Sequence, residues 1–308
     1  MIHIYRHDRS QHNSLAWYRS ITPTRQHTQN LIADYNIPAS FISAAIDPDE
    51  RPRIEQQGEC VLLILHIPYT DPDVMQHADA VKYRTVPFSM ILTADHFITL
   101  CKKDAALGPD FFTHSSLLHN QPQPAQVAMT VIANTAEHFV QAIQNIEQAI
   151  QQAEAELVQS YRNQELYALL YLNESLLYIN SSLKQLIQVL SKAELQHAIL
   201  HSDYDHALYR QSLIEFEQVA AVAKINQLNL NNVMDAYGNI IQNNVSHVVK
   251  LLTAITIVLS IPTLIASIYG MNVPLPFQEA EYAFNYLVIA MCLCSALVAY
   301  YFYKKRYF

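Results

Sequence analysis

Two long uncharged, apolar segments near the C-terminus constrain the fold of this 308-residue chain more than any other feature. The first is Leu251–Tyr269, which is 19 residues long, and the second is Tyr282–Tyr303. A helix of about 20 apolar residues crosses the hydrocarbon core of a bilayer, which is about 30 Å thick. Only a short connection separates the segments, so we expect a hairpin of two transmembrane helices at 251–269 and 282–303.

The charges that flank the hairpin predict its orientation. Lys250 precedes the first segment, Lys304, Lys305 and Arg306 follow the second, and the connection Val273–Glu281 contains neither Lys nor Arg. Basic residues are enriched on the cytoplasmic side of membrane proteins. The first residues of the chain also lack the apolar core of a signal peptide. We therefore expect a multi-pass protein of the cell inner (plasma) membrane, with both termini in the cytosol.

Residues 1–122 predict a cytosolic α/β domain. They contain most of the prolines, two helical pieces at Thr28–Tyr35 and Gly108–Leu118, and β-like runs at Ser40–Ile46, Cys60–Ile67, Val86–Leu92 and His96–Cys101. Residues 125–261 contain no proline. Because proline costs about 3 kcal/mol in a helix interior, long helices are expected there.

The last of these helices is predicted to run from about His206 to Tyr269, roughly 95 Å at 1.5 Å per residue. No small domain can cover a rod of that length, so we expect it to pack against copies of itself. The resulting fold class is an α+β membrane protein. It has an N-terminal α/β cytosolic domain at 1–122, a helical cytosolic domain and stalk at 123–247, and a two-helix transmembrane pore domain at 248–308.

Composition argues against several function classes. The formal net charge is −8 and no basic cluster lies outside the C-terminus, so nucleic-acid binding is not expected. The sequence has no nucleophile elbow, phosphate-binding glycine loop or GxGxxG, so we expect neither an enzyme nor a catalytic cofactor. Two histidine pairs four residues apart, His3 with His7 and His197 with His201, leave a metal site open as an alternative to surface histidines.

A polar stripe follows the predicted last helix in alternating steps of three and four residues. All but one of its positions are polar or glycine: Asp235, Asn239, Gln242, Ser246, Val249, Thr253, Thr256, Ser260, Thr263, Ser267 and Gly270. A 3.5-residue repeat keeps one face of supercoiled helices on the bundle axis. We interpret the stripe as the lining of a water-filled pore built from one helix per copy. The alternative is that the hydroxyls bond to their own backbone and serve as small packing residues.

Val249 is the apolar exception in the stripe, and Leu252 lies near it on the next turn. A ring of aliphatic side chains can close a pore by dewetting. Val249 and Leu252 are therefore the gate candidates.

The stripe ends at the tip of the hairpin, in the sequence Tyr269-Gly270-Met271-Asn272. Asn272 offers a neutral amide oxygen, which can accept a hydrogen bond from the water of a hydrated cation. Gly270 allows an unusual turn at the helix end. Tyr269 can anchor that turn at the membrane interface. In the connection that follows, Glu279 and Glu281 either raise the local cation concentration or simply solubilise the loop.

Tyr-Gly-Met-Asn at the end of the penultimate membrane helix, a short acidic loop, one more membrane helix and a basic tail together resemble the CorA family of magnesium channels. The resemblance implies passive, potential-driven uptake of hydrated magnesium, with cobalt and nickel as further ions, through a homopentamer. It implies that Tyr269, Gly270, Met271 and Asn272 form the selectivity filter and that Asn272 contacts the metal through its bound water. It also implies closure when cytosolic magnesium occupies regulatory sites between the soluble domains.

Two alternatives stay open. The sequence Val273-Pro274-Leu275-Pro276 departs from the commonest family pattern after the filter, so a zinc transporter of the same superfamily, related to ZntB, is the nearest alternative. Met271 favours magnesium. The other alternative is a membrane-tethered sensor without transport, which predicts an apolar seam where the stripe from Thr253 to Ser267 is polar.

Overall fold

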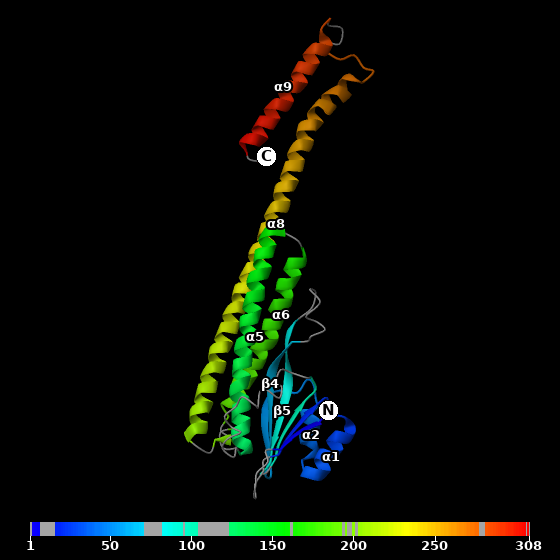
Figure 1. Cartoon of the computed structure of the whole chain (residues 1–308). Helices are drawn as coiled ribbons and strands as arrows, with labels where there is room; N and C mark the ends of the chain where they lie inside the picture. The colour runs from blue at the N-terminus through cyan, green and yellow to red at the C-terminus, as the bar shows by residue number, and fades with distance from the viewer. Residues whose placement is uncertain are drawn as a thin grey trace. The chain divides into compact units, whose positions relative to one another are not determined.

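The computed structural model describes all residues except 1, 7–15, 71–81, 95, 104–122, 161–162, 193–194, 196–198, 201–202, 277–280, 306 and 308. By their contacts, the described residues form two compact units, Met1–Asn232 and Val233–Phe308 (Figure 1). The predicted division at 122 and 247 stays a prediction. The predicted helix at Gly108–Leu118 lies outside the described residues.

The N-terminal unit contains a six-stranded sheet in the order β1-β2-β6-β5-β4-β3. Neighbouring strands are antiparallel except β2 and β6, which are parallel. The strands are β1 (Ile2–Arg6), β2 (Ala16–Ile21), β3 (Arg53–Gln57), β4 (Cys60–Thr70), β5 (Tyr83–Leu92) and β6 (His96–Cys101). The strands predicted at 60–67, 86–92 and 96–101 are confirmed as parts of β4, β5 and β6.

Strand β4 is deeply buried in the core of the N-terminal unit. The side chains of Leu62, Leu63, Ile64 and Leu65 have no exposed surface. Successive side chains of a strand point to opposite faces, so both faces of the sheet are covered at this level. The strand begins after a tight turn in which Gln57 pairs with Cys60 and Gly58 takes a φ of 60°, a conformation that favours glycine.

Two short helices precede the central strands. Helix α1 (Arg25–Tyr35) begins at Thr24, whose side chain accepts from the His27 backbone N–H, and ends at Asn36 in the left-handed region. Helix α2 (Ala39–Ala45) follows Pro38. The strand predicted at Ser40–Ile46 is therefore wrong. This short apolar run is equally suited to a buried helix, whose residues Phe41, Ile42, Ala44 and Ala45 pack in one core cluster with Leu62, Ile91 and Ile98.

Two long helices complete the N-terminal unit together with the first part of α8. Helices α5 (Pro124–Ser160) and α6 (Asn163–Leu190) contact each other and pack against β4 and β5. In Figure 1 they lie to the left of the β4–β5 pair, and α1 and α2 lie to the right. The phenyl rings of Phe139 on α5 and Phe216 on α8 meet edge to face, with centroids 6.2 Å apart.

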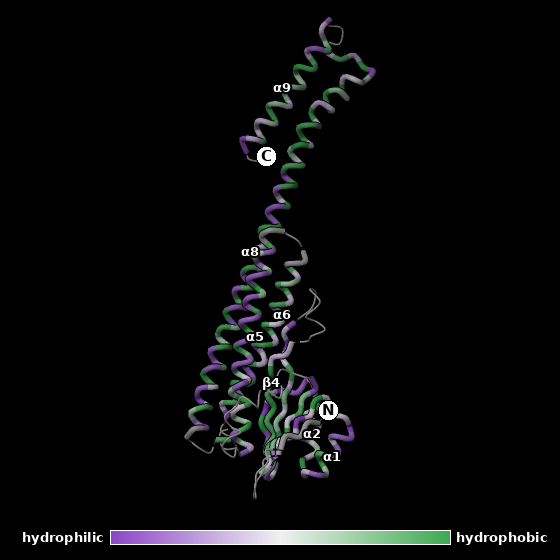
Figure 2. The backbone as a smooth tube through the Cα atoms, viewed as in Figure 1, coloured by the Kyte–Doolittle hydropathy of each residue, from purple (hydrophilic) through white to green (hydrophobic). Residues whose placement is uncertain are grey.

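Helix α8 (Asp203–Tyr269) is continuous over 67 residues and carries Pro262 in its interior. Helix α9 (Ala283–Lys304) follows and has 22 residues. Both are long and apolar enough to cross a membrane, and hydrophobic colours predominate along α9 and the last turns of α8 in Figure 2. The predicted fold class is confirmed: an N-terminal sheet domain, one long helix and two C-terminal candidate membrane helices.

Candidate functional site

The predicted polar stripe lies on one continuous helix. Ten of its positions, Asp235 to Ser267, belong to α8, and Gly270 follows the helix end directly. In a single copy every stripe position is exposed except Ser246, which is half-buried. The stripe therefore has no covering partner within the described part of its own chain.

Five hydroxyls of the stripe share one hydrogen-bonding pattern. Each donates to the carbonyl four residues earlier: Ser246 to Gln242 at 2.8 Å, Thr253 to Val249 at 2.8 Å, Thr256 to Leu252 at 2.8 Å, Ser260 to Thr256 at 2.7 Å and Thr263 to Leu259 at 3.0 Å. A hydroxyl has one hydrogen to donate and two lone pairs that accept. Each group therefore keeps acceptor capacity toward its surroundings after its hydrogen is used by the helix.

An open groove of about 680 Å³ follows the membrane part of the stripe. Four stripe residues and four apolar neighbours line it: Thr256, Ile257, Leu259, Ser260, Ile261, Thr263, Leu264 and Ser267. The groove thus combines hydroxyl oxygens with aliphatic walls on one side of α8.

The gate candidates lie near the start of the apolar segment of α8. Val249 is 56% exposed and Leu252 is 63% exposed. Three residues apart on a helix, they present neighbouring side chains on adjacent turns. Nothing within the described residues of one copy covers either side chain, so a closed ring would require other copies.

The tip of the hairpin is held by three hydrogen bonds. The N–H of Gly270 donates to Ala266 at 2.9 Å, the N–H of Met271 donates to Ile268 at 3.1 Å, and Oη of Tyr269 donates to the carbonyl of Pro276 at 3.2 Å. Met271 and Asn272 are exposed in the loop that these bonds enclose.

The expected unusual turn at Gly270 is not found. Its φ is not among the positive values, which within the described residues include one glycine, Gly58. A Cβ built on Gly270 would lie 3.4 Å from the Ala266 carbonyl oxygen and 3.5 Å from that of Ser267, which is ordinary contact. The helix simply ends in a right-handed turn there.

The predicted acidic residues of the connection and the two histidine pairs lie only partly within the described residues. Glu281 is exposed before α9, and Glu279 lies outside the described residues. Each of the two histidine pairs includes residues outside the described part of the chain, and within that part no three His, Cys, Asp or Glu side chains gather as a metal site would need.

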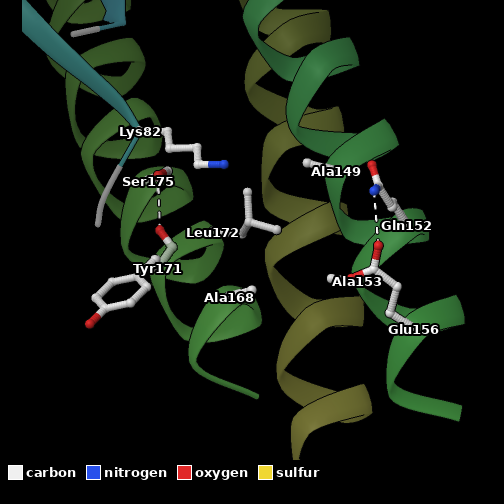
Figure 3. Close-up of a pocket in the computed structure, with 9 residues that line it drawn as sticks. All are labelled: Lys82, Ala149, Gln152, Ala153, Glu156, Ala168, Tyr171, Leu172 and Ser175. Carbon is white, nitrogen blue, oxygen red and sulfur yellow. Dashed lines mark hydrogen bonds between the residues drawn. The ribbon is translucent and has the colours of Figure 1, made fainter. Parts of the chain in front are cut away.

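A second cavity, of about 200 Å³, lies between α5 and α6 (Figure 3). Lys82 points into it, and its single carboxylate, Glu156, accepts from Nε2 of Gln152 at 2.9 Å. Three alanines form much of the wall, Ala149, Ala153 and Ala168. One carboxylate beside a lysine is a poor set of ligands for a divalent cation, which prefers several oxygen donors.

Comparisons with known proteins indicate the family of this chain. The family model described as CorA-like Mg²⁺ transporter protein matches residues 12–305. The cobalt/magnesium transport protein CorA of Methanocaldococcus jannaschii is 20% identical over 299 residues, which cover 94% of this chain and 90% of that protein.

Solved structures resemble the fold over similar lengths. The complete CorA magnesium transporter structure from Methanocaldococcus jannaschii matches with a TM-score of 0.80 at 19% identity, covering 94% of this chain and 90% of that one. The ZntB cytoplasmic domain from Vibrio parahaemolyticus matches with a TM-score of 0.51 at 13% identity, covering 75% and 88%. Because the family model matches residues 12–305, nearly the whole chain, this chain belongs to the CorA-like Mg²⁺ transporter family of membrane transporters.

Proposed function

We propose that this chain forms a channel for passive uptake of hydrated magnesium across the inner membrane, with α8 as the pore-lining helix and Asn272 as the filter. The observation that carries the proposal is the row of hydroxyls on α8, each with its hydrogen already donated to the helix backbone. The row leads to an exposed amide at the helix end.

The chemistry of hydrated magnesium fits such a row. Magnesium binds oxygen and dehydrates reluctantly, so it travels with much of its water. Water bound to a cation points its hydrogens outward, and these need acceptors. The stripe hydroxyls of Thr253, Thr256, Ser260 and Thr263 supply acceptor oxygens without a fixed negative charge that would hold the ion tightly. The hydrogen bonds from these hydroxyls to the helix backbone are therefore compatible with a pore lining as well as with a packing role.

Asn272 extends this acceptor chemistry to the filter. Its amide oxygen is neutral and accepts from metal-bound water, and the loop that carries it is closed by the bond from Tyr269 to Pro276. In the proposed assembly five copies place five such amides around one axis. Tyr269, Gly270 and Met271 form the rest of the filter, and Glu281 and Glu279 attract cations to its mouth.

The membrane potential supplies the driving force. With both termini in the cytosol, as Lys304 and Lys305 at the end of α9 favour, a negative interior drives a divalent ion inward by about 4.6 kcal/mol per 100 mV, twice the single-charge value. Cobalt and nickel are proposed as further ions. The Methanocaldococcus jannaschii relative is described as a cobalt/magnesium transport protein, which supports cobalt. Cytosolic magnesium is the proposed regulatory ion.

The test is ion flux into liposomes that contain the purified protein, under an imposed potential, with magnesium, zinc and cobalt compared. Asn272→Ala should lower magnesium flux at least about tenfold, which corresponds to about 1.4 kcal/mol of lost transition-state stabilisation. Asn285→Ala, an exposed amide in the first turn of α9, is the matched control and should keep wild-type flux.

Other outcomes would contradict the role of Asn272 or favour one of the two alternative functions. Wild-type flux in a folded Asn272→Ala variant would remove this residue from the filter. Zinc flux without magnesium flux would favour the ZntB-like alternative, and no flux of any ion would favour a membrane-tethered sensor.

A further inference from the structure

A chain of hydrogen bonds joins the sheet to helix α6 through one histidine of β4. Nε2 of His66 lies 2.8 Å from the carbonyl oxygen of Glu50, and Nδ1 lies 2.9 Å from Oγ of Ser182 on α6. Oγ of Ser182 lies 2.6 Å from Oγ1 of Thr85 on β5. His66 and Ser182 are 116 residues apart in the sequence, so only the folded chain brings them together.

The partners of the imidazole determine where its hydrogen lies. The Glu50 carbonyl can only accept, so Nε2 carries the hydrogen of the neutral ring and Nδ1 is an acceptor. Ser182 then donates to Nδ1, and Thr85 donates to Ser182. A second proton on Nδ1 turns this acceptor into a donor, so the Ser182 hydroxyl has to reverse its direction while a positive charge appears in a half-buried site.

The surroundings offer this charge little compensation. The Glu50 carboxylate accepts from the Arg51 N–H at 3.1 Å and lies 3.7 Å from the Arg53 guanidinium. On β5 and α6, the titratable groups nearest in sequence to Thr85 and Ser182 are Tyr83, Arg84, Tyr178 and Lys184, and Arg84 lies over the Tyr178 ring at 5.8 Å. Burial accordingly holds the pKa of His66 below its ordinary value, and the Glu50 carbonyl opposes this only in part.

Helix α6 is also bonded to α8 within the same turn. Nδ2 of Asn180 donates to Oε1 of Gln227 at 3.0 Å. The same turn of α6 is therefore hydrogen-bonded to the sheet through Ser182 and to α8 through Asn180.

We propose that His66, Ser182 and Thr85 form a proton-sensitive joint that holds α6 against β4 and β5 while the imidazole is neutral and loosens when acidification protonates it. The joint lies in the N-terminal unit, so the proposal does not depend on ion transport. Because the folded-state pKa of His66 lies below the unfolded-state value of about 6.5, the stabilisation is fully present above that pH and is lost as the pH falls below it.

Hydrogen exchange of the full chain in detergent, at about pH 7.5 and about pH 5.5 and corrected for the intrinsic pH dependence, tests the joint across the range where histidine titrates. In the wild type, acidification should speed exchange in peptides from β4, β5 and residues 176–190 of α6. His66→Gln stays neutral at both values and can still donate to the Glu50 carbonyl, so it should lose this acid-induced increase.

Two histidines serve as controls. His138 on α5 is also partly buried, with its pKa lowered chiefly by burial, and His206 on α8 is exposed. His138→Gln and His206→Gln should both keep the wild-type increase in these peptides. A wild type without the increase, or a His66→Gln variant that retains it, overturns the proposal.

Ser182→Ala provides a second variant if His66→Gln does not fold. It removes the α6 end of the joint at every pH, so exchange in the same peptides should already be fast at about pH 7.5. Exchange equal to the wild type at that pH would also overturn the proposal.

Discussion

At the scale of single residues, the tip of the membrane hairpin depends on a tyrosine more than on its glycine. Oη of Tyr269 reaches the carbonyl of Pro276, seven residues later, and closes the loop that contains Asn272. Gly270 has an ordinary backbone conformation, and a methyl group would meet only ordinary contacts within its own copy. The contacts around Gly270 within one copy therefore do not require a glycine.

Tyr269→Phe removes the hydroxyl and nothing else. We expect the loop to lose about 0.5–1.5 kcal/mol of stabilisation, the usual net value of one hydrogen bond. Magnesium flux in liposomes should fall, but less than in Asn272→Ala, because the filter amide remains. Tyr282→Phe, exposed just before α9, controls for the loss of a surface hydroxyl, and equal flux in both variants would show that the loop does not need the bond.

At the scale of elements, α8 carries most of the proposed chemistry. Pro262 removes one backbone hydrogen bond from the helix interior, yet α8 continues to Tyr269. The hydroxyl bonds on either side of this point, from Ser260 and from Thr263, keep the same pattern. The row of acceptor oxygens therefore continues past the proline.

Charged substitutions at the gate test whether an aliphatic ring closes the pore. Val249→Asp or Leu252→Asp should make the constriction wettable and raise basal magnesium flux about tenfold or more, the effect of removing about 1.4 kcal/mol of barrier. His247→Asp is the control, since it adds a carboxylate at an exposed position outside the stripe on the same turn. Unchanged basal flux in both gate variants would argue against a hydrophobic gate at this level.

Single cysteines test which face of α8 lines the pore. In a Cys292→Ala, Cys294→Ala background, cysteines at Thr253, Thr256, Ser260 and Thr263 should react with a water-soluble thiol reagent and lose flux. Cysteines at the apolar neighbours Ile255, Val258 and Ile265, which do not line the groove, should react slowly, because apolar surroundings disfavour the reactive thiolate. Equal labelling of the two sets would assign the hydroxyls to packing instead.

At the scale of the whole molecule, one copy leaves much apolar surface unpartnered. Ile240, Val245 and Val248, on the part of α8 that precedes the membrane segment, are all exposed. Exposed apolar surface of this kind outside a membrane marks an interaction site. Together with the uncovered polar stripe, it favours assembly of several copies around α8.

We expect the assembly to contain five copies. Native mass spectrometry of the protein released from mild detergent should give five times the 35.1 kDa subunit mass, with chemical crosslinking in the membrane as an independent control. A monomer or dimer under both conditions would contradict the proposed pore, because a ring of amides needs several copies.

The sequence by itself determined the features that local pattern controls. Two uncharged apolar runs predict the hairpin, and the absence of proline from 125 to 261 predicts the long helices that α5, α6 and α8 confirm. The motif at Tyr269–Asn272 within this hairpin was enough to indicate the family, which the family model shows. The stripe and gate residues were readable from register and the filter residues from the resemblance to the family, and their roles stay predictions.

Only the tertiary structure decided what depends on distant partners. The short apolar run at Ser40–Ile46 suits a strand or a buried helix, and α2 forms because its apolar side chains pack against the sheet. The His66–Ser182 contact joins residues 116 apart that no periodicity relates, and the bond from Tyr269 to Pro276 forms only because the loop after α8 folds back. The direction of the stripe hydroxyls toward their own backbone likewise depends on side-chain rotamers, which residue type alone leaves open.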